Sequence, residues 1–135
     1  MKDENITLLT EKEKNEMRVD DLSFDFAKRI VLLRKYLISN VVSREYDISR
    51  QILRSGTSIG ANIAESEHPQ SSAYYLSKIN IALKEANETK FWLKLLRDCK
   101  YIPENLAESL LIDCCRIISI LVTIVNKVSQ RIKKS

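Results

Sequence analysis

The stretch RQILRSGTSIGANIAESE, residues 50–67, contains both glycines of the 135-residue chain, Gly56 and Gly60. Glycines spaced this closely are typical either of a phosphate-binding loop or of a helix that a neighbouring element approaches. A phosphate-binding loop needs a Lys-Ser or Lys-Thr pair after its second glycine and a strand before its first, and this stretch has neither. Its isoleucines instead recur at helical spacing along one face. We therefore expect the stretch to form one helix.

Two further strips run beside the apolar face of this helix. The first is almost free of side chains and consists of Gly56, Gly60 and Ala64. A glycine inside a helix costs about 1 kcal/mol relative to alanine, so two are tolerable where the close approach of another helix offsets that cost. The second strip is short and polar and consists of Gln51, Ser55, Ser58, Asn62 and Glu65. An exposed helix surface usually carries lysine and glutamate, whereas the side chains of this strip are short and mostly uncharged. The strip therefore indicates a polar contact surface, or seam, between helices or subunits more than a surface exposed to solvent.

The rest of the chain contains three more segments in which apolar residues recur every three or four positions. Ser71 or Ser72 can cap the second of them, and Pro103 suits the first turn of the third, where a missing N–H costs nothing. Four helices joined by short turns predict an all-α fold, an up-down-up-down antiparallel four-helix bundle over residues 20–132. The glycine-containing helix is expected to begin between residues 43 and 47 and to end near residue 65. The other three expected helices span about residues 20–40, 72–99 and 103–132.

Charge is unevenly distributed along the chain. Residues 1–22 carry four basic and seven acidic residues, a net charge of −3, so a total of +4 leaves +7 on the remainder. A body this basic favours polyanionic partners, although extra lysines also serve solubility alone. Residues 1–19 are polar and lack sustained periodicity, and we expect them to form a flexible N-terminal arm.

Basic residues on the predicted helices are the candidates for contacts with nucleic-acid phosphates, because phosphate binding needs cations but no fixed motif. Those near the C-terminus also complement the dipole of the last helix, which is an alternative reason for their presence. The candidates are Lys28, Arg29, Arg50, Arg54, Lys90, Lys94, Arg97, Lys127 and Arg131.

Two other features have a functional and a structural interpretation. Trp92 can stack on a base, but an anchor inside the bundle or at a subunit seam is the favoured role. Glu85 and Glu88 resemble a catalytic carboxylate pair, yet acid–base catalysis needs a pocket with convergent partners that the sequence does not reveal. Ion pairing of these glutamates with Arg50 or Arg54 is the simpler interpretation.

Several function classes are disfavoured by composition. The chain has one histidine and three cysteines without a CxxC pair, so we expect no metal site, no cofactor and no enzymatic activity. The thiols fit a reducing cytoplasm. The N-terminus lacks the apolar core of a signal peptide, and the longest uncharged apolar run is too short to span a bilayer, so we expect no membrane association.

Residues 50–67, followed by INIALKEANETKFWLKLL at residues 79–96, resemble the four-helix-bundle family that includes the 23S rRNA intervening-sequence proteins. The resemblance covers about residues 22–130, and its most specific piece is SIGANIAE at residues 58–65. Ser66 stands where the family usually has glycine, so the following loop is expected to start differently.

This resemblance implies a bundle that assembles into a ring-like homopentamer and is associated with insertions in large-subunit ribosomal RNA. A related branch comprises the accessory variability determinants of diversity-generating retroelements, whose ring binds nucleic acid and a reverse transcriptase. No catalytic activity is established for the family. We therefore expect a non-enzymatic oligomer that binds structured RNA or RNA/DNA through basic patches. The alternative is an interaction scaffold whose ring docks a protein partner such as a reverse transcriptase.

Overall fold

The computed structural model describes residues 9–42 and 44–134. The described residues form five helices and no strand, which confirms the all-α prediction. The four long helices agree closely with the four predicted spans. The helices are α1 (Glu11–Glu16), α2 (Val19–Ser39), α3 (Asp47–Ser66), α4 (Ser72–Asp98) and α5 (Glu104–Lys134).

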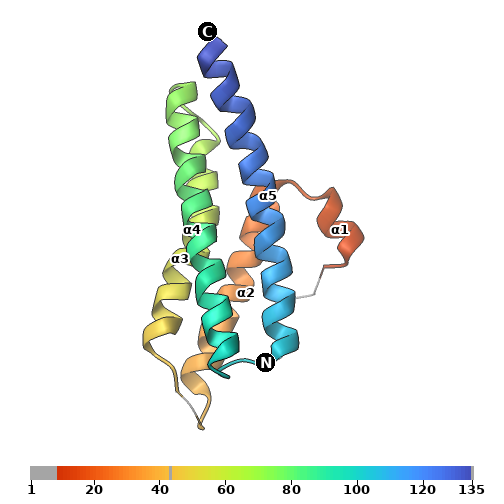
Figure 1. The fold of residues 1–135 in the computed structure, drawn as a ribbon, viewed down its shortest axis with the longest axis vertical. Coiled ribbons are helices and arrows are strands. Elements are labelled where there is room, and N and C mark those ends of the chain that lie inside the picture. Colours follow the sequence, from red (N-terminus) through yellow and green to blue (C-terminus); the bar gives the residue numbers. More distant parts are fainter. Residues whose placement is uncertain (1–8, 43, 135) are drawn as a thin grey trace.

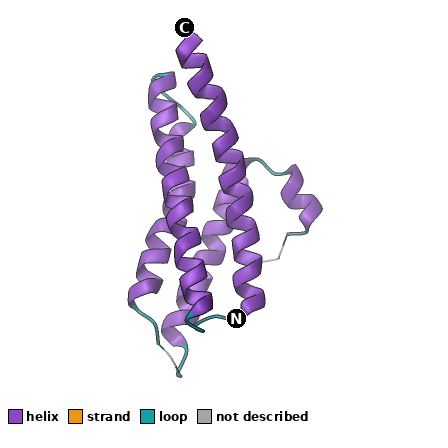
Figure 2. Cartoon of the chain, in the orientation of Figure 1, coloured by secondary structure: helices purple, strands orange, loops and turns teal. Residues whose placement is uncertain are grey.

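The four long helices stand side by side, and successive ones run in opposite directions (Figure 1). Helices α3 and α4 each pack against both of their neighbours in the chain, and α2 also contacts α5, more sparsely than the other pairs. Short loops join them, and α1 lies to one side of the bundle (Figure 2). The contact between α2 and α5 closes the bundle, so a single core lies between all four helices.

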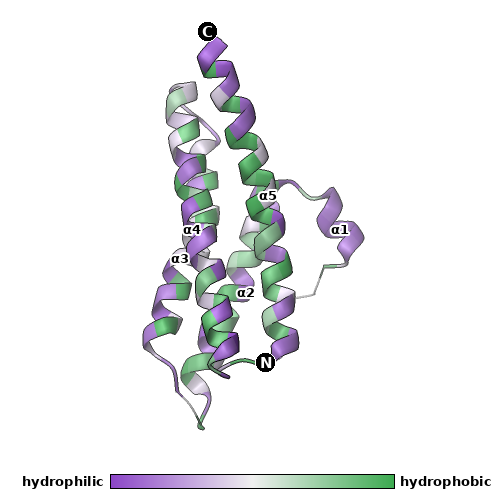
Figure 3. Ribbon diagram, viewed as in Figure 1, coloured by the Kyte–Doolittle hydropathy of each residue, from purple (hydrophilic) through white to green (hydrophobic). Residues whose placement is uncertain are grey.

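Apolar residues at helical spacing build that core, and hydrophobic and hydrophilic positions alternate along every long helix (Figure 3). The β-branched run at residues 117–125 is part of α5 and not a strand. Val41 continues the four-residue spacing of Leu33 and Leu37, which predicts a buried position, but it is 82% exposed because α2 already ends at Ser39. The largest fully buried side chains are Phe26, Ile30, Leu33, Leu37, Ile52, Ile59, Ile79, Leu93, Leu96, Leu110, Ile117 and Leu121.

Within the segment predicted as a flexible arm, residues 1–19, the structure places the short helix α1 at Glu11–Glu16. Thr10 caps α1 by accepting the N–H of Glu13 at 3.1 Å, and the Glu13 carboxylate accepts the N–H of Thr10 at 2.7 Å. Lys14 is then buried against Asp113, to which its Nζ donates at 2.7 Å. A helix of six residues is too short to show periodicity, and its docking depends on a residue 99 positions away. Residues 1–8 lie outside the described part of the chain.

Candidate nucleic-acid interface

The two glycines lie where α2 and α3 approach each other. A Cβ placed on Gly56 would lie 2.8 Å from Cγ2 of Ile30, closer than real side chains come. A Cβ on Gly60 would lie 3.4 Å from the backbone oxygen of Ser23, which is an ordinary contact. Both glycines have helical neighbours on each side, so the stretch is a helix and not a loop. Gly56 and Gly60 therefore serve packing within one chain, whereas Ala64, the third member of the strip, is exposed.

The polar strip of α3 faces α4 and is buried at one position. Ser55 is completely buried, and its Oγ accepts a hydrogen bond of 2.8 Å from the Thr89 hydroxyl of α4. At the far end of the strip Glu65 pairs with Lys78 at 2.7 Å. Within one chain, the strip is thus a seam between α3 and α4 at these two points.

The other members of the strip satisfy their polar groups on α3 itself. The Asn62 amide donates to the Ser58 backbone oxygen at 2.8 Å and to its hydroxyl at 3.0 Å. Gln51 is exposed and accepts from Arg54 Nε at 3.3 Å. A role of Gln51, Ser58 and Asn62 between subunits stays a prediction.

Arg54 is tied to α4 by two carboxylates. Its guanidinium donates to Glu85 at 3.1 Å and also pairs with Glu88. The Glu88 carboxylate in turn accepts from the Trp92 indole N–H at 3.1 Å. The structure thus shows the ion pairing expected for these glutamates, with Arg54 as the partner. A phosphate that binds Arg54 must compete with both carboxylates.

Trp92 is half-buried against the core, as expected of an anchor. Its indole meets the exposed ring of Phe91 edge-on, with the two centroids 5.0 Å apart. Because the Trp92 N–H is already taken by Glu88 within the same helix, its hydrogen-bonding capacity is used inside the chain.

Arg29 has to be removed from the candidate list, because only 3% of it is exposed. Its guanidinium donates to Asp113 at 2.7 Å and to the Ser109 hydroxyl at 3.1 Å. Asp113 therefore holds Lys14 of α1 by one oxygen and Arg29 of α2 by the other, and Arg116 of α5 lies 3.6 Å from it. Burial of an unpaired charge is costly, so Lys14, Arg29 and Asp113 stabilise one another and bind α1 and α2 to α5. The helical spacing that placed Arg29 with surface cations could not reveal its distant partner.

Two titratable side chains near this network are affected by burial. Desolvation, followed by repulsion from Asp113, raises the pKa of Asp25 above its ordinary 3.8. Burial likewise raises the pKa of the Cys114 thiol to about 12, and this thiol donates to the Ala86 backbone oxygen at 3.3 Å. The Cys114 thiol is therefore not suited to nucleophilic chemistry at neutral pH.

Two of the remaining candidate cations have acidic partners. Arg97 donates to Asp98 at 2.9 Å and lies 3.8 Å from Glu108, and the bond to Asp98 raises its pKa. Exposed Arg50 lies 3.7 Å from Asp47. These ion pairs are exposed or partly so, and are worth little by themselves.

The other five candidates have no carboxylate partner among the ion pairs of the described residues. Lys28 lies 5.2 Å from the centroid of the exposed Phe24 ring. Lys90 is half-buried, whereas Lys94, Lys127 and Arg131 are exposed. The structure thus leaves cations open to solvent on α2, α4 and the C-terminal part of α5.

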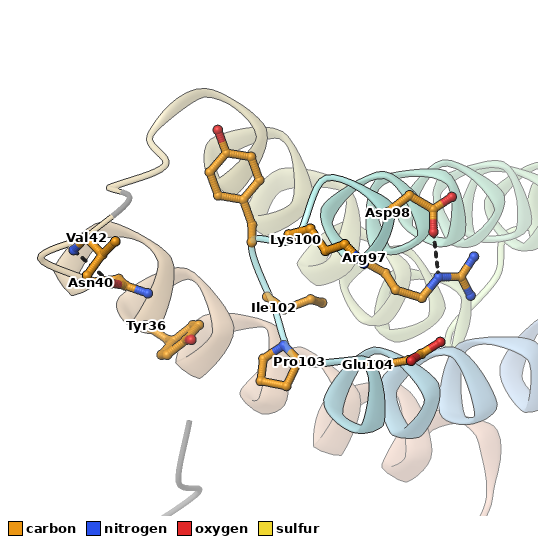
Figure 4. A pocket seen from close by; sticks show the side chains of 10 residues that line it. Tyr36, Asn40, Val42, Arg97, Asp98, Lys100, Ile102, Pro103 and Glu104 are labelled. Atoms are coloured by element: carbon orange, nitrogen blue, oxygen red, sulfur yellow. Dashed lines mark hydrogen bonds and ion pairs between the residues drawn. The ribbon is translucent and has the colours of Figure 1, made fainter.

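A hollow of about 620 Å³ lies at the end of the bundle where α2 ends and α5 begins (Figure 4). It contains Arg97 and Lys100, but also Asp98 and Glu104, so its charges balance. Figure 4 shows Arg97 turned toward Asp98. Its lining is Tyr36, Asn40, Val42, Arg97, Asp98, Lys100, Tyr101, Ile102, Pro103 and Glu104.

Two hollows lie at the opposite end, on either side of the loop that joins α3 to α4, and they share Pro69 and Tyr75. One, of about 600 Å³, contains Arg18 and His68 together with Asp20 and Glu67. The other, of about 550 Å³, is lined by Pro69, Ser71, Ser72, Tyr75, Ile124, Lys127, Val128 and Arg131. This second hollow brings two candidate cations together without a carboxylate.

Residues 9–42 and 44–134 contain no group of three or more histidine, cysteine or acidic side chains placed to hold a metal ion. No helix in this part of the chain has the length and apolar character needed to cross a membrane.

The fold defines the chain as an all-helical bundle protein with a basic surface. A family model described as 23S rRNA-intervening sequence protein matches residues 15–123, so the chain belongs to that family. The chain is also similar to the crystal structure of a protein of unknown function from the S23 ribosomal protein family of Bacteroides thetaiotaomicron. The two are 50% identical and superpose with a TM-score of 0.77, over 80% of this chain and 98% of the other. No curated protein matches the chain.

Proposed function

We propose that this protein is a non-enzymatic nucleic-acid-binding bundle that takes structured RNA, or RNA/DNA, on its basic surface. The observation that carries the proposal is the net +7 on residues 23–135, much of it on side chains that the structure leaves open to solvent. The family name adds an association with ribosomal RNA insertions. Lys28, Lys94, Lys127 and Arg131 are the exposed cations that we assign to phosphate contacts.

The proposed assembly is an up-down-up-down four-helix bundle repeated in a ring-like homopentamer in the cytoplasm. A ring presents each cationic patch five times. Once one patch has bound the nucleic acid, the other patches bind at a high effective concentration, so a modest charge per chain gives a high overall affinity. Contacts of this kind release counterions, and the affinity then falls steeply as salt rises. The buried Arg29 takes no part, and Arg54 contributes only by exchanging its carboxylate partners for phosphate.

A filter-binding titration against structured RNA over a range of salt concentrations tests this function. We expect the logarithm of the association constant to fall linearly with the logarithm of salt, with a slope that reports the phosphates contacted. Absence of binding even at low salt contradicts the proposal. Sedimentation of the free protein tests the assembly separately, since a monomer at micromolar concentration contradicts the homopentamer.

A second candidate is an interaction scaffold that docks a protein partner such as a reverse transcriptase. Large apolar side chains on the surface favour it, because Phe24 is 66% exposed, Phe91 58% and Ile112 52%. Exposed aromatic residues are enriched at protein interfaces. A single protein partner that co-purifies from the source cell and stays bound after nuclease treatment supports this candidate over RNA binding.

A further inference from the structure

The hollow between the start of α4 and the C-terminal part of α5 differs in charge from the other two large hollows described. Those two each contain acidic side chains that offset their cations. Here the charged side chains that the described residues contribute to the lining are Lys127 and Arg131. The two lie four residues apart on α5, so their heads lie on one side of the helix. Both are exposed and have no partner among the ion pairs of the described residues. Such a site attracts anions.

The remaining walls are apolar or carry neutral hydroxyls. Ile124 and Val128 form a floor from α5, and Val128 is only 8% exposed. Tyr75 is half-buried and packs against the core, which holds its ring in place while one side lines the hollow. The Ser71 hydroxyl is used inside the chain, since it accepts the N–H of Tyr74 at 3.0 Å. The hollow thus places a fixed aromatic ring beside two cations.

From this arrangement we infer that the hollow binds one unpaired nucleotide of single-stranded RNA, with its phosphate on Lys127 and Arg131 and its base against Tyr75. The inference rests on the proposed function and assigns it a specific site. A volume of about 550 Å³ is within the range of about 300–1,000 Å³ typical of small-ligand pockets. A stacked base in a duplex cannot enter such a hollow, whereas the bases of loops and bulges can turn out and stack on aromatic rings. The start of α4 at Ser72 adds the positive end of a helix dipole to a site that already has two cations.

Anisotropy titration with a labelled single-stranded RNA of about five nucleotides tests the inference, with a longer, stably paired RNA duplex as competitor. The variant Lys127→Gln/Arg131→Gln is expected to weaken binding of the single strand at least tenfold, because no cation remains in the hollow to neutralise the phosphate. The matched control Lys35→Gln/Lys84→Gln removes the same charge from exposed positions outside the hollow and is expected to change the affinity less than twofold. Equal effects of the two double variants overturn the inference.

The role of the aromatic ring is tested separately, because charge alone does not require it. Tyr75→Leu is expected to weaken binding by about fivefold or more, whereas Tyr75→Phe retains it, since stacking needs the ring and not the hydroxyl. Circular dichroism checks that each variant is folded. A Tyr75→Leu protein that is folded and binds like the wild type overturns the assigned base contact.

The outcome for the wild type separates this inference from the proposed function. Binding of structured RNA without binding of the short single strand overturns the nucleotide site and leaves the proposed function standing. Binding of neither RNA at low salt overturns both. Binding of the short single strand that Lys127→Gln/Arg131→Gln and Tyr75→Leu both weaken supports the site.

Discussion

Gly56 of α3 lies directly against Ile30 of α2, so close that a Cβ on the glycine would come within 2.8 Å of Ile30 Cγ2. Ile30 is completely buried, so its side chain cannot turn out into solvent to make room. The absence of one side chain therefore sets the distance between two helices at the centre of the bundle.

We predict that Gly56→Ala destabilises the protein by about 1–3 kcal/mol, because overpacking outweighs the better helix propensity of alanine. Gly60→Ala is the matched control, since its Cβ would meet Ser23 at an ordinary 3.4 Å. That change is expected to be neutral or to stabilise by up to about 1 kcal/mol. Urea unfolding measures both. Equal effects at the two positions would show that helix propensity, not the contact with Ile30, decides the outcome.

The ion pair of Lys14 with Asp113 leads to a second prediction. Asp113→Asn removes the carboxylate that the buried cations Lys14 and Arg29 share and is expected to cost about 3–5 kcal/mol. Lys14→Met leaves Asp113 paired with Arg29 and is expected to cost less, while it weakens the docking of α1 on α5 to the ion pair of Glu11 with Arg116. Hydrogen exchange of residues 11–16 measures this weakening, and Lys12→Met, at an exposed position, is the control. Unchanged protection of α1 in Lys14→Met contradicts the docking role.

Asp25 makes stability depend on pH in a defined direction. Burial and repulsion from Asp113 raise its pKa above 3.8, so the folded state binds its proton more tightly than the unfolded state does. Its contribution to stability is therefore fully present below pH 3.8 and is lost as pH rises through the elevated pKa. Asp25→Asn is expected to raise the free energy of unfolding at neutral pH and to have less effect below pH 3.8. Urea titrations across this range, with exposed Asp21→Asn for comparison, measure the difference. The opposite pH trend refutes it.

Arg29 and Lys94 are both cations on predicted helices, but the structure gives them different roles. Lys94→Gln is expected to leave stability unchanged, to weaken binding of structured RNA, and to reduce the salt slope by about 1 for each phosphate that is no longer neutralised. Arg29→Gln is expected to lower stability instead, because it breaks a buried ion pair. Thermal unfolding and the filter-binding titration together separate the two effects. An Arg29→Gln protein of wild-type stability contradicts the buried role.

Local pattern was enough to predict most of the architecture. The periodicity of apolar residues located all four long helices, because a helix that must bury one face repeats its apolar positions every three or four residues. The glycine stretch was predicted as a helix for the same reason. The pattern did not predict α1, whose six residues are too few to repeat.

The candidate interface was predicted less completely. The sequence placed Lys127 and Arg131 among the candidate phosphate contacts, because both are basic residues on a predicted helix. Their position beside Tyr75 could not be predicted, since it depends on α4 and α5 running side by side. Spacing also grouped Arg29 with exposed cations, because a charged side chain is mostly exposed unless a partner far along the chain accompanies it.

The sequence by itself determined the four long helices and the basic character of residues 23–135, since local apolar spacing and composition are enough for these two features. The partner that approaches the glycines, α2 with Ile30, was set by tertiary packing. Only the tertiary structure decided which charges are available to a partner. Asp113 buries two cations from helices far away in sequence, whereas the C-terminal part of α5 leaves Lys127 and Arg131 in solvent. The physical reason is that the free energy of a charge depends on its burial and on its partner, and both are set by packing between distant segments.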